Sequence, residues 1–439
     1  MRGRPSRSRG RPPAVGVFGL LGSGNLGNDG SMAAVLAHVR SAHPDARLGA
    51  LCAGPDRVAE RYGVPATRMN WFEGEYRTAA GPRAIALKAL GKVVDAFRTA
   101  AWVRRHDLVI VPGMGVLEAT LPLRPWGFPY SLFLLCATGR LLGTRIALVG
   151  VGADEIRRGA TRRLIVWSAR LAHFRSYRDE LSRDALAHMG VDTAEDPVHP
   201  DLAFALDLPT AGARYGGGVG VGVMDYSGSN DDRADAQEIR ARYLQRITEV
   251  VRRLLREGRE VRLFTGDEAD EVVVAEILAE VATRPDGVDP AKLHAGATSD
   301  LETLMGQMGR MDLVVATRYH NVLSALAVAT PTISLSYAGK NDALMADMGF
   351  AEFCQPVRGF EVDRLFEQIA ELEDRQHEVR ATLTERTEQA ARRVTEVLAQ
   401  LSPALLPPAG GQAAVSTRLR TLTRRSTVDV GPPPAPPAR

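Results

Sequence analysis

The chain has 439 residues, of which 45% are hydrophobic and 24% are charged, and its formal net charge at pH 7 is +3. This length exceeds what one ordinary core uses, so it predicts a globular protein of two domains. Five Arg and no acid fall within residues 1–13, and five Arg and one Asp fall within residues 416–439. The rest of the chain is therefore acidic, near −6, which excludes nucleic acid as the main partner because phosphate neutralisation needs a basic surface.

The two ends of the chain are predicted to be disordered tails. Residues 1–13 are basic, and residues 403–439 are rich in Pro and Arg, so neither segment can build a core. Their charge permits a weak contact with an acidic membrane surface. No apolar run reaches the roughly 18–20 residues of a membrane span.

The cysteines predict a cytoplasmic protein. Cys52, Cys136 and Cys354 lie in apolar contexts and have no C-x-x-C spacing. Buried free thiols are the expected state, and they fit a reducing compartment.

Between the tails, apolar strand-like runs alternate with helical periodicity. Residues 14–205 predict a first Rossmann-like domain, with strands at residues 15–21, 48–53, 108–111 and 145–149. Residues 206–360 predict a second, with strands at residues 219–224, 261–264, 312–317 and 331–336. Helices are expected at residues 31–42, 84–103, 130–142, 235–257, 270–282 and 300–309, and a charged helical segment at residues 361–402 that packs back across the first domain. The predicted fold is α/β, with two parallel sheets that face each other across a cleft.

A glycine-rich segment at residues 22–30 follows the first strand and matches G-x-G-x-x-G. A dinucleotide site would need an acid at the end of the second strand, but the nearest one, Asp56, lies beyond a proline. Two other interpretations remain open, a tight turn or a loop that brings Asn25, Asn28 and Asp29 to the cleft. There the amides could bind sugar hydroxyls, and Asp29 could accept a hydroxyl proton.

Two further features of the first domain have both structural and functional interpretations. Gly113 and Gly115 follow a strand, where glycine lets backbone N–H groups approach a ligand, although ordinary turns use it too. Arg178 next to Asp179 is either a structural ion pair or cap, or a cleft arginine that binds an anionic donor.

The most informative segment is the strand at residues 312–317, which is followed by Arg318 and His320 and then by a helix. Ligands of open α/β sheets bind at this edge, and helix N-termini there favour anions. The guanidinium of Arg318 suits carboxylate or phosphate, and the imidazole of His320 can move a proton near neutral pH. The alternative is a surface arginine and a buried histidine with satisfied hydrogen bonds. Tyr337 and Lys340 follow the next strand and favour the functional interpretation.

These residues together resemble the polysaccharide pyruvyl transferase family over roughly residues 15–355. The matching motifs are Asn25-Leu-Gly-Asn-Asp29, Pro112-Gly-Met-Gly115, Gly150-Val-Gly152, Tyr177-Arg-Asp179 with Ser182, Pro200-Asp201, and Arg318-x-His320 with Tyr337-x-x-Lys340. The chain departs from the family at Pro112-Gly-Met-Gly115, where a glycine run is commoner, and at Asn28-Asp29, where Asp-Glu is commoner.

The resemblance implies a fold similar to the GT-B glycosyltransferases and transfer of a pyruvyl group from phosphoenolpyruvate, with a cyclic ketal formed on two hydroxyls of a saccharide. The acceptor would be free, lipid-linked or nucleotide-linked, and would lie on the first-domain side, against Asn25, Asn28, Asp29, Gly113 and Gly115. The second domain would hold the donor. His320 and Arg318 are then the candidate catalytic residues, and Lys340, Arg178 and Tyr337 are the candidate donor-binding residues. Phosphoenolpyruvate is a co-substrate in this scheme, which needs no cofactor and no metal.

Two other functions remain open, a GT-B-type glycosyltransferase that uses a nucleotide sugar and a non-catalytic relative that keeps the fold. In the first, Arg318 and Lys340 would hold a diphosphate. No H-E-x-x-H, G-x-S-x-G or Walker A motif occurs in the chain, which argues against zinc proteases, serine hydrolases and P-loop NTPases.

Overall fold

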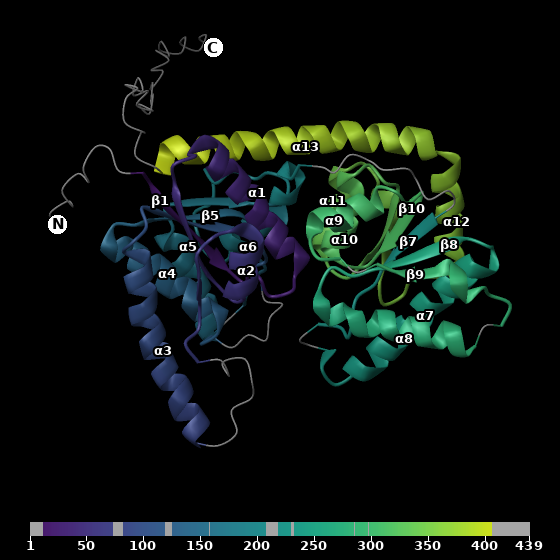
Figure 1. The fold of residues 1–439 in the computed structure, drawn as a ribbon, viewed down its shortest axis with the longest axis horizontal. Coiled ribbons are helices and arrows are strands. Elements are labelled where there is room, and N and C mark those ends of the chain that lie inside the picture. Colours follow the sequence, from purple (N-terminus) through teal and green to yellow (C-terminus); the bar gives the residue numbers. More distant parts are fainter. Residues whose placement is uncertain are drawn as a thin grey trace, which may run out of the picture.

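The structure, a computed structural model, describes residues 12–72, 82–118, 125–157, 159–207, 218–229, 232–284, 286–296 and 298–405. It consists of two lobes, each with a six-stranded parallel sheet and flanking helices (Figure 1). The predicted fold class, two Rossmann-like α/β domains, is confirmed. The predictions for residues 1–11 and 406–439 lie outside the described residues, as does most of the segment around the predicted domain boundary at residue 205. Residues 403–405, which were expected to belong to the disordered tail, are helical, because α13 continues to Leu405.

The N-terminal lobe has the strand order β3-β2-β1-β4-β5-β6. β1 (Ala14–Gly19) and β4 (Leu108–Pro112) are buried along their whole length, as expected for strands covered on both faces. The other strands are β2 (Arg47–Cys52), β3 (Ala66–Arg68), β5 (Arg145–Val151) and β6 (Phe174–Tyr177). The helices are α1 (Leu26–Ala42), α2 (Pro55–Tyr62), α3 (Pro82–Val103), α4 (Phe128–Leu142), α5 (Gly159–Leu171) and α6 (Glu180–His188).

The C-terminal lobe repeats this plan with the order β12-β11-β10-β7-β8-β9. Its strands are β7 (Gly218–Gly222), β8 (Glu260–Phe264), β9 (Leu293–Ala295), β10 (Leu313–Ala316), β11 (Thr332–Ser336) and β12 (Cys354–Pro356). Its helices are α7 (Ala236–Arg256), α8 (Glu271–Thr283), α9 (Leu301–Met308), α10 (Tyr319–Ala327) and α11 (Gly339–Asp347). In both lobes the strand order reverses beside the first strand, which places ligand sites at the carboxyl edge of each sheet.

The charged C-terminal segment forms two helices, α12 (Val362–Asp374) and α13 (Gln376–Leu405). α13 lies across the top of both lobes in Figure 1. Thr387 Oγ1 donates to Leu326 O of the C-terminal lobe at 3.2 Å, and Arg393 Nη2 donates to Val198 O of the N-terminal lobe at 3.2 Å. The segment therefore ties the two lobes together.

Two helix starts differ from the sequence-based expectation. α1 begins at Leu26, inside the segment expected to be a loop, because Asn25 Oδ1 caps it by accepting from Asn28 N at 3.2 Å. α9 begins at Leu301, one residue later than expected, because Asp300 is its cap and accepts from Thr303 N at 2.6 Å. Among the cysteines, Cys52 and Cys136 are buried as expected, whereas Cys354 is only half-buried.

No helix in the described part of the chain has both the length and the apolarity to cross a bilayer.

Candidate active site

The candidate site lies where the carboxyl ends of strands from both sheets meet. Arg318 is the N-cap of α10, directly after β10, and Lys340 is in the first turn of α11, after β11. Arg178 follows β6 of the other lobe, and Glu118 lies shortly after β4. Two sheet edges thus contribute charged side chains to one interface.

The lobes touch directly along this interface. Leu26 N donates to Gly266 O at 3.1 Å, and Glu268 N donates to Gly24 O at 3.2 Å. Asn25 forms an isolated antiparallel β-bridge with Asp267 of the C-terminal lobe. The described structure is therefore a closed arrangement of the two lobes.

Glu118 sits between two cations from different lobes. Its Oε1 pairs with Arg178 Nη2, and its Oε2 lies 3.0 Å from Lys340 Nζ. The Glu118 and Arg178 side chains are only 5% and 3% exposed. Burial by itself would raise the pKa of Glu118, but the charges of Arg178 and Lys340 outweigh it and lower the pKa to about 2. Glu118 is thus an ionised carboxylate held by two buried cations.

Three carboxylates surround the guanidinium of Arg178. Besides Glu118, it lies 3.7 Å from Asp201 Oδ2 and 3.6 Å from Asp179 Oδ2. Although burial opposes the charged form, these acids raise the pKa of Arg178. Asp179 also caps α6 by accepting from Ser182 N at 2.7 Å, so the cap and ion-pair interpretations both hold for this residue.

Two tyrosine rings stack against the same cations. The Tyr319 ring centroid lies 4.8 Å from Arg178 Cζ and 5.8 Å from Lys340 Nζ. The Tyr337 ring lies 5.4 Å from Lys340 Nζ. Such contacts stabilise a desolvated cation and hold its side chain in place.

His320 packs against α1 of the opposite lobe. A Cβ at Gly27 would overlap its imidazole, so only glycine leaves room for the ring there. Burial lowers the pKa of His320 to about 4, Asp201 opposes this effect, and the nearby cations, with Arg178 foremost, reinforce it. In this structure the ring is therefore neutral at pH 7.

Arg318 makes a bidentate pair with Asp270. Its Nε and Nη2 donate to the two carboxylate oxygens at 2.6 and 2.7 Å, and Asp270 also accepts from Asp225 N at 2.9 Å. The Arg318 side chain is 19% exposed and the Asp270 side chain is fully buried. Burial alone would lower the pKa of Arg318, but Asp270 raises it. The guanidinium is held rigidly at the start of α10.

The three polar residues proposed to bind the acceptor have structural contacts. Asn25 Nδ2 donates to Asp267 Oδ2 at 2.9 Å across the interface, and Asn28 Nδ2 donates to Leu20 O at 3.3 Å. Asp29 Oδ1 accepts from Gly22 N at 2.7 Å, and burial raises the pKa of Asp29. These contacts stabilise the start of α1, and a role in acceptor binding stays a prediction.

The glycine turns make space for the buried ion pair. A Cβ at Gly115 would overlap the Glu118 carboxyl, and a Cβ at Gly152 would overlap both Glu118 and Arg178. Gly113 has a φ of +53°, in the left-handed region that favours glycine. Substitution of Gly115 or Gly152 would therefore displace the charged residues.

Sequence reasoning missed three residues of the site, Glu118, Tyr319 and Asp270. Glu118 had a usable signal, because it is the one acid in the apolar stretch that follows the Gly113–Gly115 turn. Asp270 had none, since it is one of several neighbouring acids. Within the described residues no group of three or more His, Cys, Asp or Glu side chains is arranged to hold a metal ion.

Comparison with known proteins gives one family match and many fold matches. The family model for polysaccharide pyruvyl transferase matches residues 25–339. Among solved structures, the chain is similar to Anabaena HepE bound to UDP, with 13% identity, a TM-score of 0.54 and coverage of 90% of this chain and 99% of that one. It is also similar to the UDP-GlcNAc 2-epimerase of Neisseria meningitidis bound to UDP-GlcNAc, with 11% identity, a TM-score of 0.54 and coverage of 89% and 99%. A third is MnaA of S. aureus with UDP, with 12% identity, a TM-score of 0.54 and coverage of 91% and 100%. At these identities the solved structures establish a shared fold.

Proposed function

Because the chain belongs to the polysaccharide pyruvyl transferase family, we propose that it transfers a pyruvyl group from phosphoenolpyruvate to two hydroxyls of a saccharide, forming a cyclic ketal. The observation that carries the proposal is the meeting of Arg178, Lys340 and His320 at the interface between the lobes. This arrangement combines carboxylate-binding cations with a group that can transfer a proton.

The donor would bind at the two cations that hold Glu118. Phosphoenolpyruvate carries a carboxylate, and Arg178 with Lys340 already holds a carboxylate in this structure. The donor carboxylate would take the place of Glu118, with Tyr337 beside the Lys340 ammonium. Arg318 would stabilise negative charge on the departing phosphate.

His320 would supply the proton that starts the reaction. Protonation of the donor methylene carbon makes the neighbouring carbon, C2, electrophilic, and a sugar hydroxyl attacks C2 and loses its own proton. Phosphate then leaves with the C2–O bonding electrons, and the second hydroxyl attacks C2 and loses its proton to close the ketal. His320 is neutral without a ligand, but an anionic donor would offset the surrounding cations and raise its pKa.

The acceptor would enter from the N-terminal lobe, past Asn25, Asn28 and Asp29 and the turn at Gly113 and Gly115. This saccharide would be free, lipid-linked or nucleotide-linked. The scheme uses phosphoenolpyruvate as co-substrate, needs no metal or further cofactor, and suits a cytoplasmic enzyme with access to that metabolite.

The test is phosphate release from phosphoenolpyruvate in the presence of a candidate acceptor. We expect His320→Ala to lose about 10²–10⁴-fold in turnover, the usual contribution of general acid–base catalysis. The matched control is His188→Ala, because the His188 side chain is 70% exposed and lies on α6, away from the cation pair. Full turnover in His320→Ala would remove this residue from the mechanism.

The fold favours one alternative, a glycosyltransferase that uses a nucleotide sugar, since HepE and MnaA were solved with UDP. In that case Arg318 and Lys340 would bind a diphosphate. A thermal-shift comparison of phosphoenolpyruvate with UDP- and GDP-sugars separates the two, because a ligand that binds only the native state raises the melting temperature. Donor binding without turnover on any acceptor would instead support a non-catalytic relative.

A further inference from the structure

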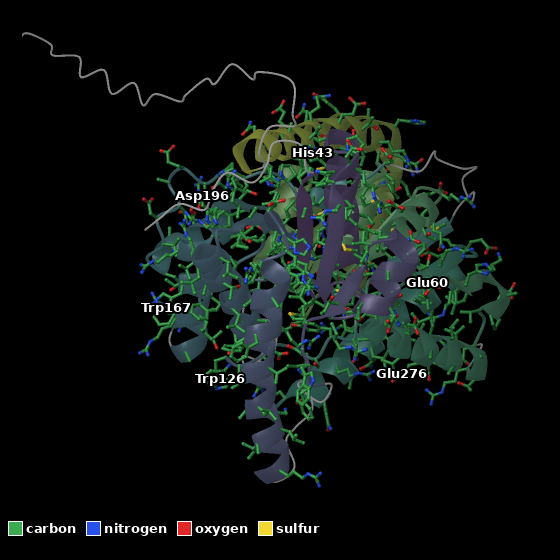
Figure 2. All side chains as sticks on the ribbon, turned by 60° about the vertical axis from the view of Figure 1, so that its left-hand side comes forward. His43, Glu60, Trp126, Trp167, Asp196 and Glu276 are labelled. Carbon is green, nitrogen blue, oxygen red and sulfur yellow. The ribbon has the colours of Figure 1, made fainter. Side chains whose placement is uncertain are left out.

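Large exposed apolar side chains are concentrated on one side of the N-terminal lobe. Only two of those in the described chain, Leu181 and Val272, lie elsewhere. The others lie on α3, α4 and α5 and on the segments that precede α3 and α4: Trp71, Ile85, Leu90, Val93, Phe97, Trp126, Leu141 and Trp167. We call this surface the α3–α5 face. Figure 2 places Trp126 and Trp167 on the same outer side of the molecule.

Aromatic contacts connect the three helices of the face. Trp126 packs on Tyr130 with ring centroids 5.8 Å apart, and Lys92 Nζ of α3 lies 5.7 Å from the Tyr130 ring. Phe133 of α4 packs on Trp167 of α5 at 5.8 Å. These contacts hold α3, α4 and α5 together as one layer of the N-terminal lobe.

α3 carries four of the eight exposed residues, Ile85, Leu90, Val93 and Phe97. The helix has 22 residues and extends away from the sheet in Figure 1. Leu90, Val93 and Phe97 are spaced three and four apart, so they share one side of the helix. Their exposed fractions are 52%, 55% and 73%. Exposed apolar side chains grouped in this way on a folded protein mark an interaction site.

The same three helices are strongly basic, although the chain between the tails is acidic. Their only acid, Asp95, is buried. Against it stand eight basic residues, Arg83, Lys88, Lys92, Arg98, Arg140, Arg162, Arg163 and Arg170. Trp, Phe and Leu side chains combined with Lys and Arg are typical of elements that lie in the interface of an anionic bilayer. An apolar face for a second copy of the chain would not need this excess of one charge.

The face also borders the candidate site. Trp71 follows β3, and Trp126 lies between β4 and α4, so both belong to the carboxyl edge of the N-terminal sheet. Glu118 lies at the same edge, after β4. A membrane bound by this face would therefore lie near the interface between the lobes.

We propose that the α3–α5 face docks the N-terminal lobe on an anionic lipid bilayer. The exposed aromatic and aliphatic side chains enter the headgroup region, and the exposed basic side chains Arg83, Arg140 and Arg163 contact lipid phosphates. Docking brings the site between the lobes within reach of an acceptor that is held in the bilayer. The proposal concerns binding to lipid and does not depend on pyruvyl transfer.

The test is binding of the full chain to vesicles, with no donor or acceptor present. We expect co-sedimentation with phosphatidylglycerol–phosphatidylcholine vesicles, much less with phosphatidylcholine alone, and weaker binding as salt rises. Three of the four tryptophans, Trp71, Trp126 and Trp167, lie on the face, and Trp102 is buried. Their fluorescence should shift to shorter wavelength on binding and be quenched by brominated lipid.

Variants test whether vesicle binding comes from the α3–α5 face or from the basic tails. Every variant keeps both tails unchanged. Each Lys or Arg near an anionic surface strengthens membrane partitioning by about fivefold. Arg163→Glu removes one positive charge and adds one negative charge, so it should weaken vesicle binding by roughly 25-fold. Phe97→Glu should also weaken binding. The matched controls are Arg242→Glu and Val272→Glu, at exposed positions of the C-terminal lobe, and they should bind as the unchanged protein does.

Three results would overturn the proposal. The first is no binding to anionic vesicles, and the second is equal loss of binding in the face variants and the controls, which would assign the binding to the tails. The third is a dimer in light scattering that Phe97→Glu dissociates while vesicle binding is unchanged, which would make the face a contact between two copies of the chain.

Discussion

Replacing the carboxylate of Glu118 tests how the two buried cations are used. If donor binding displaces this side chain from Arg178 and Lys340, a neutral residue of the same shape should leave the cations free for the ligand. We therefore expect Glu118→Gln to bind phosphoenolpyruvate more tightly than the unchanged protein. The variant should remain folded, because Arg178 keeps Asp201 and Asp179 as neighbours.

The size of the effect follows from the pKa of Glu118, which falls from its ordinary value of 4.5 to about 2. At 1.36 kcal/mol per pKa unit, the cations stabilise the ionised carboxylate by roughly 3 kcal/mol beyond the cost of its burial. A donor that displaces Glu118 must give up about this much. The dissociation constant of the variant should therefore fall by up to about 100-fold.

Isothermal titration with phosphoenolpyruvate, without acceptor, measures this constant. Glu371→Gln is the control, because Glu371 of α12 pairs with Arg375 at 3.1 Å and its side chain is 43% exposed. It should leave donor affinity unchanged. Weaker binding by Glu118→Gln would refute the displacement argument and would mean that Glu118 holds the cations in place beside the donor.

Two further predictions concern the glycine that faces His320 and the buried histidine His199. Gly27→Ala should reduce turnover at least tenfold, because the new Cβ would overlap the imidazole, and it should destabilise the fold by about 1–3 kcal/mol. Gly359→Ala is its control, since nothing lies within 4 Å of a Cβ there, and equal activity of the two variants would contradict the close packing of His320. Burial lowers the pKa of His199 from 6.5 to about 4, so the unfolded chain binds its proton at a higher pH than the folded protein does. The free energy of unfolding should therefore fall by about 3 kcal/mol as pH drops from 6.5 to 4. In urea denaturation, His199→Gln should remove this part of the pH dependence. If the free energy of unfolding of this variant depends on pH as steeply as before, His199 is not buried as a neutral ring.

The fold class and half of the site could be predicted because the signals are local. A buried strand followed directly by a helix places Arg318 and His320 at the carboxyl edge of a sheet whatever the rest of the chain does. The alternation of such units on both sides of residue 205 predicts two sheets. Both inferences need only the order of strands and helices along the chain.

Local reasoning was wrong at the start of α1 for a physical reason. Glycines at positions 27 and 30 disfavour a helix by propensity, so the segment was expected to be a loop. In the folded chain Asn25 caps the helix, and Leu26 N donates to Gly266 O of the other lobe. A contact between segments more than 200 residues apart thus helps the helix begin five residues earlier than its composition suggests.

The sequence by itself determined which residue types stand at the strand ends, and therefore that cations and a histidine occur where ligands bind. Only the tertiary structure decided how they are paired: Arg178 and Lys340 share Glu118, Arg318 is held by Asp270, and His320 lies against Gly27. Lys340 and Glu118 are 222 positions apart, so no spacing along the chain encodes their contact. Which acid neutralises which cation depends on how the two lobes close on each other, and the same closure produces the burial that lowers the pKa of His320.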